Sequence, residues 1–157
     1  LIFSEGFMKL IFLDIDGVLN SSAWLEDQYK KGRSVSMVRE FDRAAIGNLN
    51  RVVLGTGAKV VISSTWRLLY SLDHITGMLL DFGFKGVVID KTPEIFRGAR
   101  GYEIEKWMKE HRVTPGQVVI LDDSSDMGDL GGRRVLVSSR WGLTQGDAKK
   151  AIKLLQG

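Results

Sequence analysis

The apolar positions of this chain gather in five short runs, and longer segments with helical spacing lie between them. Within each run the apolar character is continuous, and most runs are rich in Val and Ile. Strands that are buried on both faces of a parallel sheet have this character. The runs cover Lys9–Asp14, Lys59–Ser64, Gly86–Asp90, Gln117–Asp122 and Arg133–Ser138. The pattern therefore predicts a five-stranded parallel sheet.

The segments between the runs carry apolar residues on one helical face. The first such face spans residues 41–53, and Gly55 follows it as a predicted C-terminal stop. Further faces cover residues 104–111 and 148–155, and a weaker one covers residues 71–81. Alternating strands and helices predict a single α/β domain that is doubly wound and Rossmann-like, with helices flanking the sheet. In such sheets the ligand site lies beyond the carboxyl ends of the strands.

The composition is typical of a globular protein. The chain has 157 residues, of which 44% are apolar and 26% charged, and this length fits one domain. No apolar run approaches the roughly 20 residues that span a bilayer, and no secretory signal pattern is present. The lack of cysteine excludes disulfides and thiolate metal sites. We therefore expect a cytoplasmic protein with no membrane partner.

The domain boundaries follow from the same pattern. Met8 opens the first predicted strand, and seven residues precede it. We expect residues 1–7 to be a leader or an upstream remnant, and residues 8–157 to form the domain.

The charge is slightly basic, with 22 Lys and Arg residues against 19 Asp and Glu residues and a net charge of +3. If several aspartates bind a metal, the remaining surface is more basic than this total. Such a surface suits a polyanionic substrate, although an ordinary slightly basic protein fits the number equally well.

Polar side chains follow three of the predicted strands. Asp14 and Asp16 end the first strand, Ser63 ends the second, and Asp122 and Asp123 end the fourth. If the first and fourth strands are neighbours, their carboxylates converge at one edge of the sheet. Mg²⁺ binds carboxylate oxygens together with water and phosphate oxygens, and crowded carboxylates need a cation. The sequence therefore predicts a Mg²⁺ site that leaves one carboxylate oxygen free to attack.

In this order, the residues resemble the haloacid-dehalogenase-like (HAD) phosphohydrolase superfamily. Asp14–Leu19 matches the first motif of that superfamily, Val60–Ser63 the second, and Val118–Asp123 the fourth. The third motif is a Lys or Arg before the last of these strands. Arg100 fits this placement best, and Lys91 is the competitor. The resemblance covers essentially the whole chain from residue 8 onward.

A narrower resemblance rests on three stretches of the chain. Ser63–Arg67, Arg100–Ile104 and Ile120–Asp123 are similar to a phage and bacterial subgroup of this superfamily. That subgroup is related to the phosphatase domains of nucleic-acid repair proteins of the polynucleotide kinase-phosphatase kind. The resemblance implies a functional link to kinase or ligase repair partners.

The superfamily resemblance implies a role for each carboxylate. Asp14 would attack phosphorus and form an aspartyl-phosphate, while Asp16 would act as general acid and then as general base. Asp14, the Asp16 backbone carbonyl and either Asp122 or Asp123 would hold Mg²⁺. Asp126 would act through a metal-bound water.

The remaining polar residues would hold the substrate. Ser63 would grip a phosphate oxygen, although it could instead cap the helix that follows. Arg100 or Lys91 would balance the negative charge. We expect Ser64 and Arg67 to contact the substrate as well.

The tryptophans and the spacing of the motifs bear on the size of the substrate. Trp24 and Trp66 follow strand ends, where they could stack on a base or sugar or pack as a wall. Only residues 21–36 are spare after the first motif, and residues 66–91 hold one helix and one strand. The sequence therefore predicts no sizeable cap domain and an open site.

An open site admits the end of a polymer. The predicted function is a phosphomonoesterase that acts on phosphorylated nucleic-acid ends, most simply a 3′-phosphate. A nucleotidase or small-molecule phosphatase with the same mechanism is the closest alternative. A non-catalytic nucleic-acid or protein-binding module is the alternative from another class.

Overall fold

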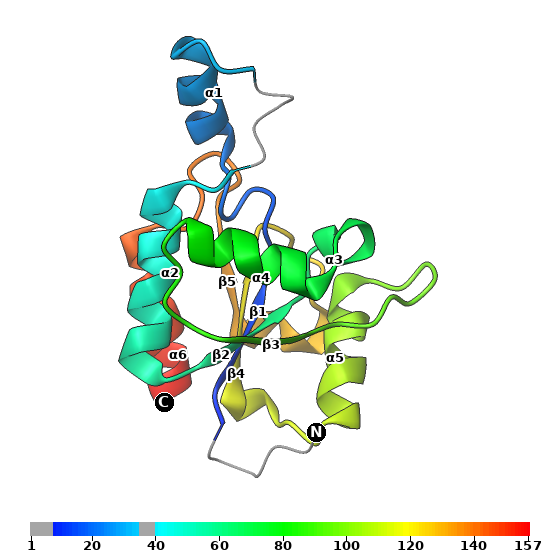
Figure 1. Ribbon diagram of the computed structural model, residues 1–157. Coiled ribbons are helices and arrows are strands. Elements are labelled where there is room, and N and C mark those ends of the chain that lie inside the picture. Colours follow the sequence, from blue (N-terminus) through cyan, green and yellow to red (C-terminus); the bar gives the residue numbers. More distant parts are fainter. Residues whose placement is uncertain (1–7, 35–39) are drawn as a thin grey trace.

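Five parallel strands form one sheet in the order β3-β2-β1-β4-β5 (Figure 1). This computed structural model describes residues 8–34 and 40–157. The predicted parallel α/β sheet is confirmed, and each strand lies within or close to its predicted run. The strands are β1 Leu10–Leu13, β2 Lys59–Ile62, β3 Val88–Lys91, β4 Val118–Asp122 and β5 Arg134–Leu136.

Helices flank the sheet and connect its strands. Short 3₁₀ segments precede β4 and β5, at Pro115–Gln117 and Gly128–Arg133. The α-helices are α1 Ser22–Lys30, α2 Arg43–Thr56, α3 Trp66–Leu69, α4 Leu72–Asp81, α5 Arg100–Glu110 and α6 Gln145–Gln156.

The two faces of the sheet carry separate hydrophobic cores. Ile11 and Leu13 of β1 point into a core that includes buried residues of α2, α4 and α6. Leu10 and Phe12 alternate with them and point into a second core with α5, where Phe12 meets Trp107 edge to face. All four β1 side chains are fully buried, because successive residues of a strand point to opposite faces. This two-sided burial explains why the strand is apolar throughout.

Helix α2 ends later than the sequence predicts. It continues through Gly55 to Thr56, and its C-cap is Gly57 in the left-handed conformation with φ 72°. A residue without Cβ adopts this conformation at little cost, whereas Gly55 keeps helical geometry. The predicted stop at Gly55 was therefore wrong by two residues.

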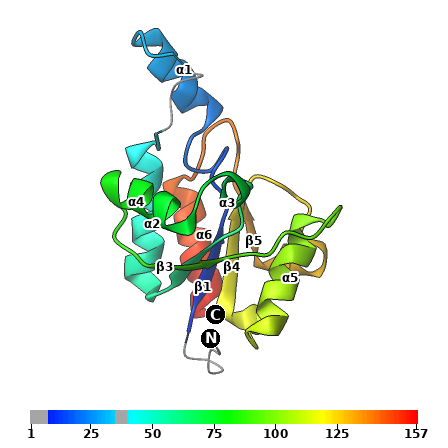
Figure 2. The same cartoon turned by 45° about the vertical axis from the view of Figure 1, so that its right-hand side comes forward.

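Helix α1 is an element that the sequence analysis did not predict. It has nine residues, none of them buried, and the Ser21 hydroxyl caps its start by accepting from the Trp24 backbone N–H. In both views α1 extends beyond the carboxyl ends of the strands (Figures 1 and 2). Its weak amphipathic pattern explains why periodicity missed it.

The expected leader, residues 1–7, and the end of the spare segment, residues 35–36, lie outside the described residues. Within residues 8–34 and 40–157, no helix combines the length and apolar character that crossing a bilayer requires.

Candidate active site

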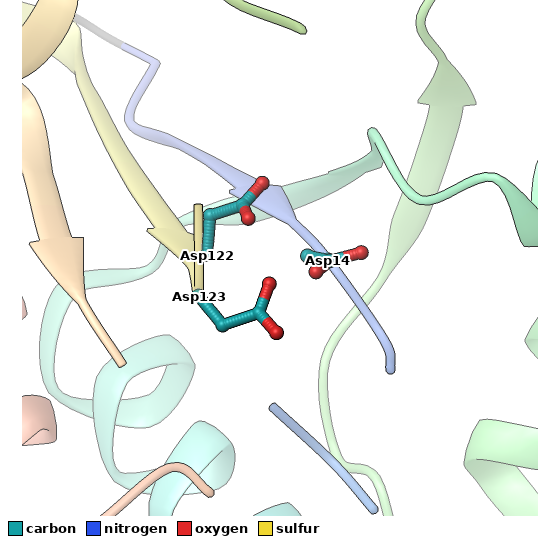
Figure 3. Close-up of side chains that lie close together, drawn as sticks. All are labelled: Asp14, Asp122 and Asp123. Carbon is teal, nitrogen blue, oxygen red and sulfur yellow. The ribbon is translucent and has the colours of Figure 1, made fainter. Parts of the chain in front are cut away.

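The carboxylates of β1 and β4 meet at the carboxyl edge of the sheet. Leu13 and Leu121 are register partners, so Asp14 and Asp122 leave neighbouring strands at the same level. The Asp14 backbone N–H donates to the Leu121 carbonyl at 3.0 Å. Carboxylate oxygens of Asp14, Asp122 and Asp123 lie within 4.8 Å of one another (Figure 3). The side-by-side pairing of β1 and β4 therefore produces a cluster with the donor set of a hard cation.

Arg100 bridges two members of this cluster. It is the first residue of α5, and its Nη1 lies 3.1 Å from Asp14 Oδ1 and 2.8 Å from Asp122 Oδ2. Lys91, at the end of β3, is exposed and forms no ion pair with a carboxylate in the described part of the chain. The geometry therefore favours Arg100 over Lys91 as the third-motif cation.

Burial dominates the electrostatics of the two bridged aspartates. The pKa of Asp14 is raised to about 7, because burial raises it most, the charge of Asp122 adds to the rise, and Arg100 opposes both effects. Burial likewise raises the pKa of Asp122, with Arg100 again lowering it. Two buried carboxylates thus share one guanidinium, and a second cation would favour their ionised forms.

Asp123 lies against the turn that follows β1. Gly17 in this turn has φ +81°, and a Cβ at this position would collide with Asp123 Oδ2. The backbone conformation therefore favours glycine, and any Cβ here would displace the Asp123 carboxylate from its position. The glycine of the first motif lets the fourth-motif carboxylate approach.

Ser63 is fully buried directly after β2, where its backbone N–H donates to the Leu13 carbonyl at 3.0 Å. Its hydroxyl has no hydrogen-bond partner among the described residues. Ser64 is also buried, but its hydroxyl accepts from the Trp66 backbone N–H at 3.2 Å and so stabilises the start of α3. Buried polar groups normally find partners, so the Ser63 hydroxyl is a candidate donor to a ligand.

Arg67 does not occupy the substrate-binding position that the sequence predicted. Only 4% of it is exposed, and its Nη2 pairs with Glu103 Oε2 of α5 at 2.8 Å. Because its donors face the protein interior, Arg67 is placed to hold the turn after β2 against α5. Its guanidinium also donates to the backbone carbonyls of Ser63, Ser64, Thr92 and Pro93.

Asp16 stands exposed beside the cluster, and two side chains fix its orientation. Its Oδ1 accepts from the Trp66 indole Nε1–H at 3.0 Å and from the Asn20 side-chain amide at 3.0 Å. Asn20 Oδ1 in turn accepts from the Gly17 backbone N–H at 3.0 Å. Sequence reasoning missed Asn20, although its place directly after the first motif was an available signal.

The family follows from a comparison over most of the chain. Residues 10–148 match the model of the HAD domain in Swiss Army Knife RNA repair proteins. The chain belongs to this HAD family. Its motifs on β1, β2, β4 and α5 all lie inside the matched range. No curated protein matches the chain.

In this HAD domain, two adjoining hollows meet at Asp16 and Asp123. The first, about 420 Å³, is also lined by Asp14, Arg100 and Asp126. Asp126 is exposed and lies at this hollow without joining the three-carboxylate cluster.

The second hollow, about 410 Å³, lies between the turn after β1, Trp66 and Leu25 of α1. Trp24 is half-buried on α1, and Trp66 packs against Phe41 with ring centroids 5.5 Å apart. The structure therefore places Trp66 in the wall of the site.

Proposed function

We propose that this HAD domain hydrolyses phosphate monoesters through an aspartyl-phosphate on Asp14. The observation that carries the proposal is the arrangement of Arg100 between Asp14 and Asp122, beside a strand end where the buried Ser63 hydroxyl has no hydrogen-bond partner in the described part of the chain. A phosphoryl group bound in the first hollow would face the Asp14 carboxylate as nucleophile and the Arg100 guanidinium, both of which line that hollow. Such groups are typical of phosphoryl-transfer sites.

The reaction would run in two displacements. A carboxylate oxygen of Asp14 attacks phosphorus, the ester P–O bond breaks, and Asp16 gives its proton to the departing oxygen. Asp16 then takes a proton from a water molecule that attacks the aspartyl-phosphate. This second step releases inorganic phosphate, restores Asp14 and leaves Asp16 protonated for the next cycle. Arg100 and Ser63 would hold the non-bridging oxygens throughout.

The donor set fits Mg²⁺, which would be held by Asp14, the Asp16 backbone carbonyl and Asp123, with Asp126 acting through water. When bound, this ion would neutralise charge on the transferring phosphoryl group. The carboxylate of Asp122 is less available to a metal, because its Oδ2 accepts a hydrogen bond from Arg100 and its Oδ1 accepts one from the Ser124 backbone N–H at 2.8 Å. We therefore assign Asp123 as the direct ligand of the fourth motif and Asp122 as the partner that positions Arg100.

The substrate we propose is a phosphorylated nucleic-acid end, most simply a 3′-phosphate. The family model is named for RNA repair proteins, and the net charge of +3 suits a polyanion. Among the described residues between the turn after β1 and α2, α1 is the one helix, so no bulky cap covers the hollows. A kinase or ligase that prepares or joins the same ends is the partner class that follows from this substrate.

Phosphate release by the purified chain with Mg²⁺ tests the activity. We expect turnover of 4-nitrophenyl phosphate that Asp14→Asn abolishes, and faster turnover of 3′-phosphorylated oligonucleotides than of mononucleotides. Equal rates on oligonucleotides and mononucleotides would support the nucleotidase alternative. Tight oligonucleotide binding with no phosphate release from any substrate would support a non-catalytic binding module.

A further inference from the structure

We infer that Trp66 and Asn20 are positioning residues for Asp16, and that they make one of its two carboxylate oxygens the proton donor. This inference rests on the proposed function, because it concerns how the acid/base group of that reaction is held. Trp66 lies outside the first motif and reaches Asp16 from the start of α3, 50 residues along the chain.

Both side-chain donors converge on the same oxygen. The Trp66 indole and the Asn20 amide each donate to Asp16 Oδ1 at 3.0 Å. An indole N–H can only donate a hydrogen bond. The Asn20 side chain is oriented because its Oδ1 accepts a hydrogen bond from the Gly17 backbone N–H, which leaves the amide nitrogen to donate to Asp16. A carboxyl oxygen that accepts two hydrogen bonds is a poor place for the acid proton. The proton of Asp16 therefore belongs on Oδ2, to which no described residue donates a hydrogen bond.

The indole itself is held by contacts on several sides. Its ring packs against Phe41 and Tyr70, with centroids 5.5 Å and 5.3 Å away. The Ser64 hydroxyl accepts from its backbone N–H, and the next residue, Arg67, is anchored to Glu103. Because these contacts fix the turn, the indole N–H presents a preset direction to Asp16, which is otherwise exposed. Preset orientation is what an exposed general acid lacks by itself.

The position of Asp16 between the two hollows gives this orientation its use. In an in-line displacement the leaving group departs on the side of phosphorus opposite to the attacking oxygen. Asp14 lines only the first hollow, whereas Asp16 lines both hollows. A leaving alkoxide that departs towards the second hollow would pass Asp16. The residues that hold Asp16 should therefore matter most when the leaving oxygen needs a proton.

The test is the leaving-group dependence of Trp66→Phe. This variant keeps an aromatic ring against Phe41 and Tyr70 and removes the indole N–H. With 4-nitrophenyl phosphate, whose leaving group departs without protonation, we expect kcat/KM to fall less than about threefold. With a 3′-phosphorylated oligonucleotide, whose leaving group is an alkoxide, we expect a fall of about 10- to 100-fold.

One control and one further variant separate this role from a structural one. Trp107→Phe also loses an indole–carboxylate hydrogen bond, the one to Asp90 at 2.8 Å. It should leave the ratio of the kcat/KM values for the two substrates unchanged. Asn20→Ala removes the amide donor without placing a new charge beside Asp16, so it should shift the ratio of the kcat/KM values for the two substrates in the same direction as Trp66→Phe.

An equal fall of kcat/KM on both substrates in Trp66→Phe and Asn20→Ala would overturn the inference while leaving the phosphatase activity established. A wild-type protein without turnover on either substrate would overturn the proposed function instead. The two failures are therefore distinguishable in one set of assays.

Discussion

Arg67 and Glu103 form a buried ion pair with 2.8 Å between Nη2 and Oε2, and this pair joins the turn after β2 to the first turns of α5. Glu103 Oε2 also accepts from the Ile95 backbone N–H at 3.0 Å. The turn carries Ser63 and leads into α3, which begins at Trp66, and α5 carries Arg100. One ion pair therefore aligns two sides of the site without touching the three-carboxylate cluster.

We predict that Glu103→Gln destabilises the protein by about 3–5 kcal/mol, because it leaves the Arg67 guanidinium buried without a countercharge. Chemical denaturation monitored by circular dichroism measures this change. Lys106 and Glu110 on the same helix form an exposed pair at 2.8 Å, so Glu110→Gln is a matched control that should change stability by less than about 1 kcal/mol. Similar changes in the two variants would contradict the role assigned to the buried pair.

We predict that Arg100→Ala lowers kcat by about 100- to 1000-fold, because it removes the guanidinium that we propose stabilises the transferring phosphoryl group. Lys91→Ala, at the exposed end of β3, should change kcat by less than about threefold, because no site contact is lost. Steady-state kinetics on an aryl phosphate with Mg²⁺ compares the two variants. A larger loss of kcat in Lys91→Ala than in Arg100→Ala would assign the third-motif role to Lys91 instead.

Asp14 should lower the stability of the metal-free protein as the pH rises. Its pKa is about 7 in the folded state against an ordinary value of 3.8, so the folded protein holds a proton that the unfolded chain has lost. The stability that this proton confers is fully present below about pH 4 and is lost as the pH rises through about 7.

Asp14→Asn removes this pH dependence. In EDTA at pH 8 we expect it to be more stable than the wild type by about 1–3 kcal/mol, with the difference vanishing near pH 4. Thermal melts across this range measure the effect. Added Mg²⁺ should raise the wild-type Tm more than that of the variant, because metal binding favours the ionised carboxylate. A difference that does not change with pH would show that Asp14 does not titrate in this window.

We predict that Gly17→Ala weakens metal binding at least about tenfold, because the new Cβ displaces the Asp123 carboxylate and the backbone has φ +81°. Isothermal titration with Mg²⁺ or Mn²⁺ measures the change. Gly32 also has a positive φ of +83° but has open space around its Cβ position, so Gly32→Ala separates backbone strain from the collision. Equal affinities in Gly17→Ala and the wild type would exclude Asp123 as a direct ligand.

Much of the fold and the candidate cluster could be predicted because they depend on local pattern. Burial on both faces makes β1 and β4 continuously apolar, and the polar residue after each strand marks the carboxyl edge. Once these strands are neighbours, Asp14, Asp122 and Asp123 must converge. The position of each carboxylate at a strand end could be read from adjacent residues, whereas the pairing of β1 with β4 is a property of the packed sheet.

Three features were decided only by the tertiary structure. Arg67 is interior because it pairs with Glu103, 36 residues away, although its place beside Trp66 looked like a substrate contact. The hydrogen bonds from Trp66 and Asn20 to Asp16 depend on how the turn after β2 packs against the turn after β1. Helix α1 buries none of its residues, so its sequence shows little helical pattern.

One physical reason explains why some features could be predicted from the sequence and others could not. Strand burial and the order of residues at strand ends are properties of short segments, and the sequence by itself determined them. The partner of a guanidinium, an indole N–H or an amide is chosen among groups that are distant in sequence. Only the packed structure decides which of these groups lie within hydrogen-bond reach, and it therefore decided how Asp16 and the walls of its site are held.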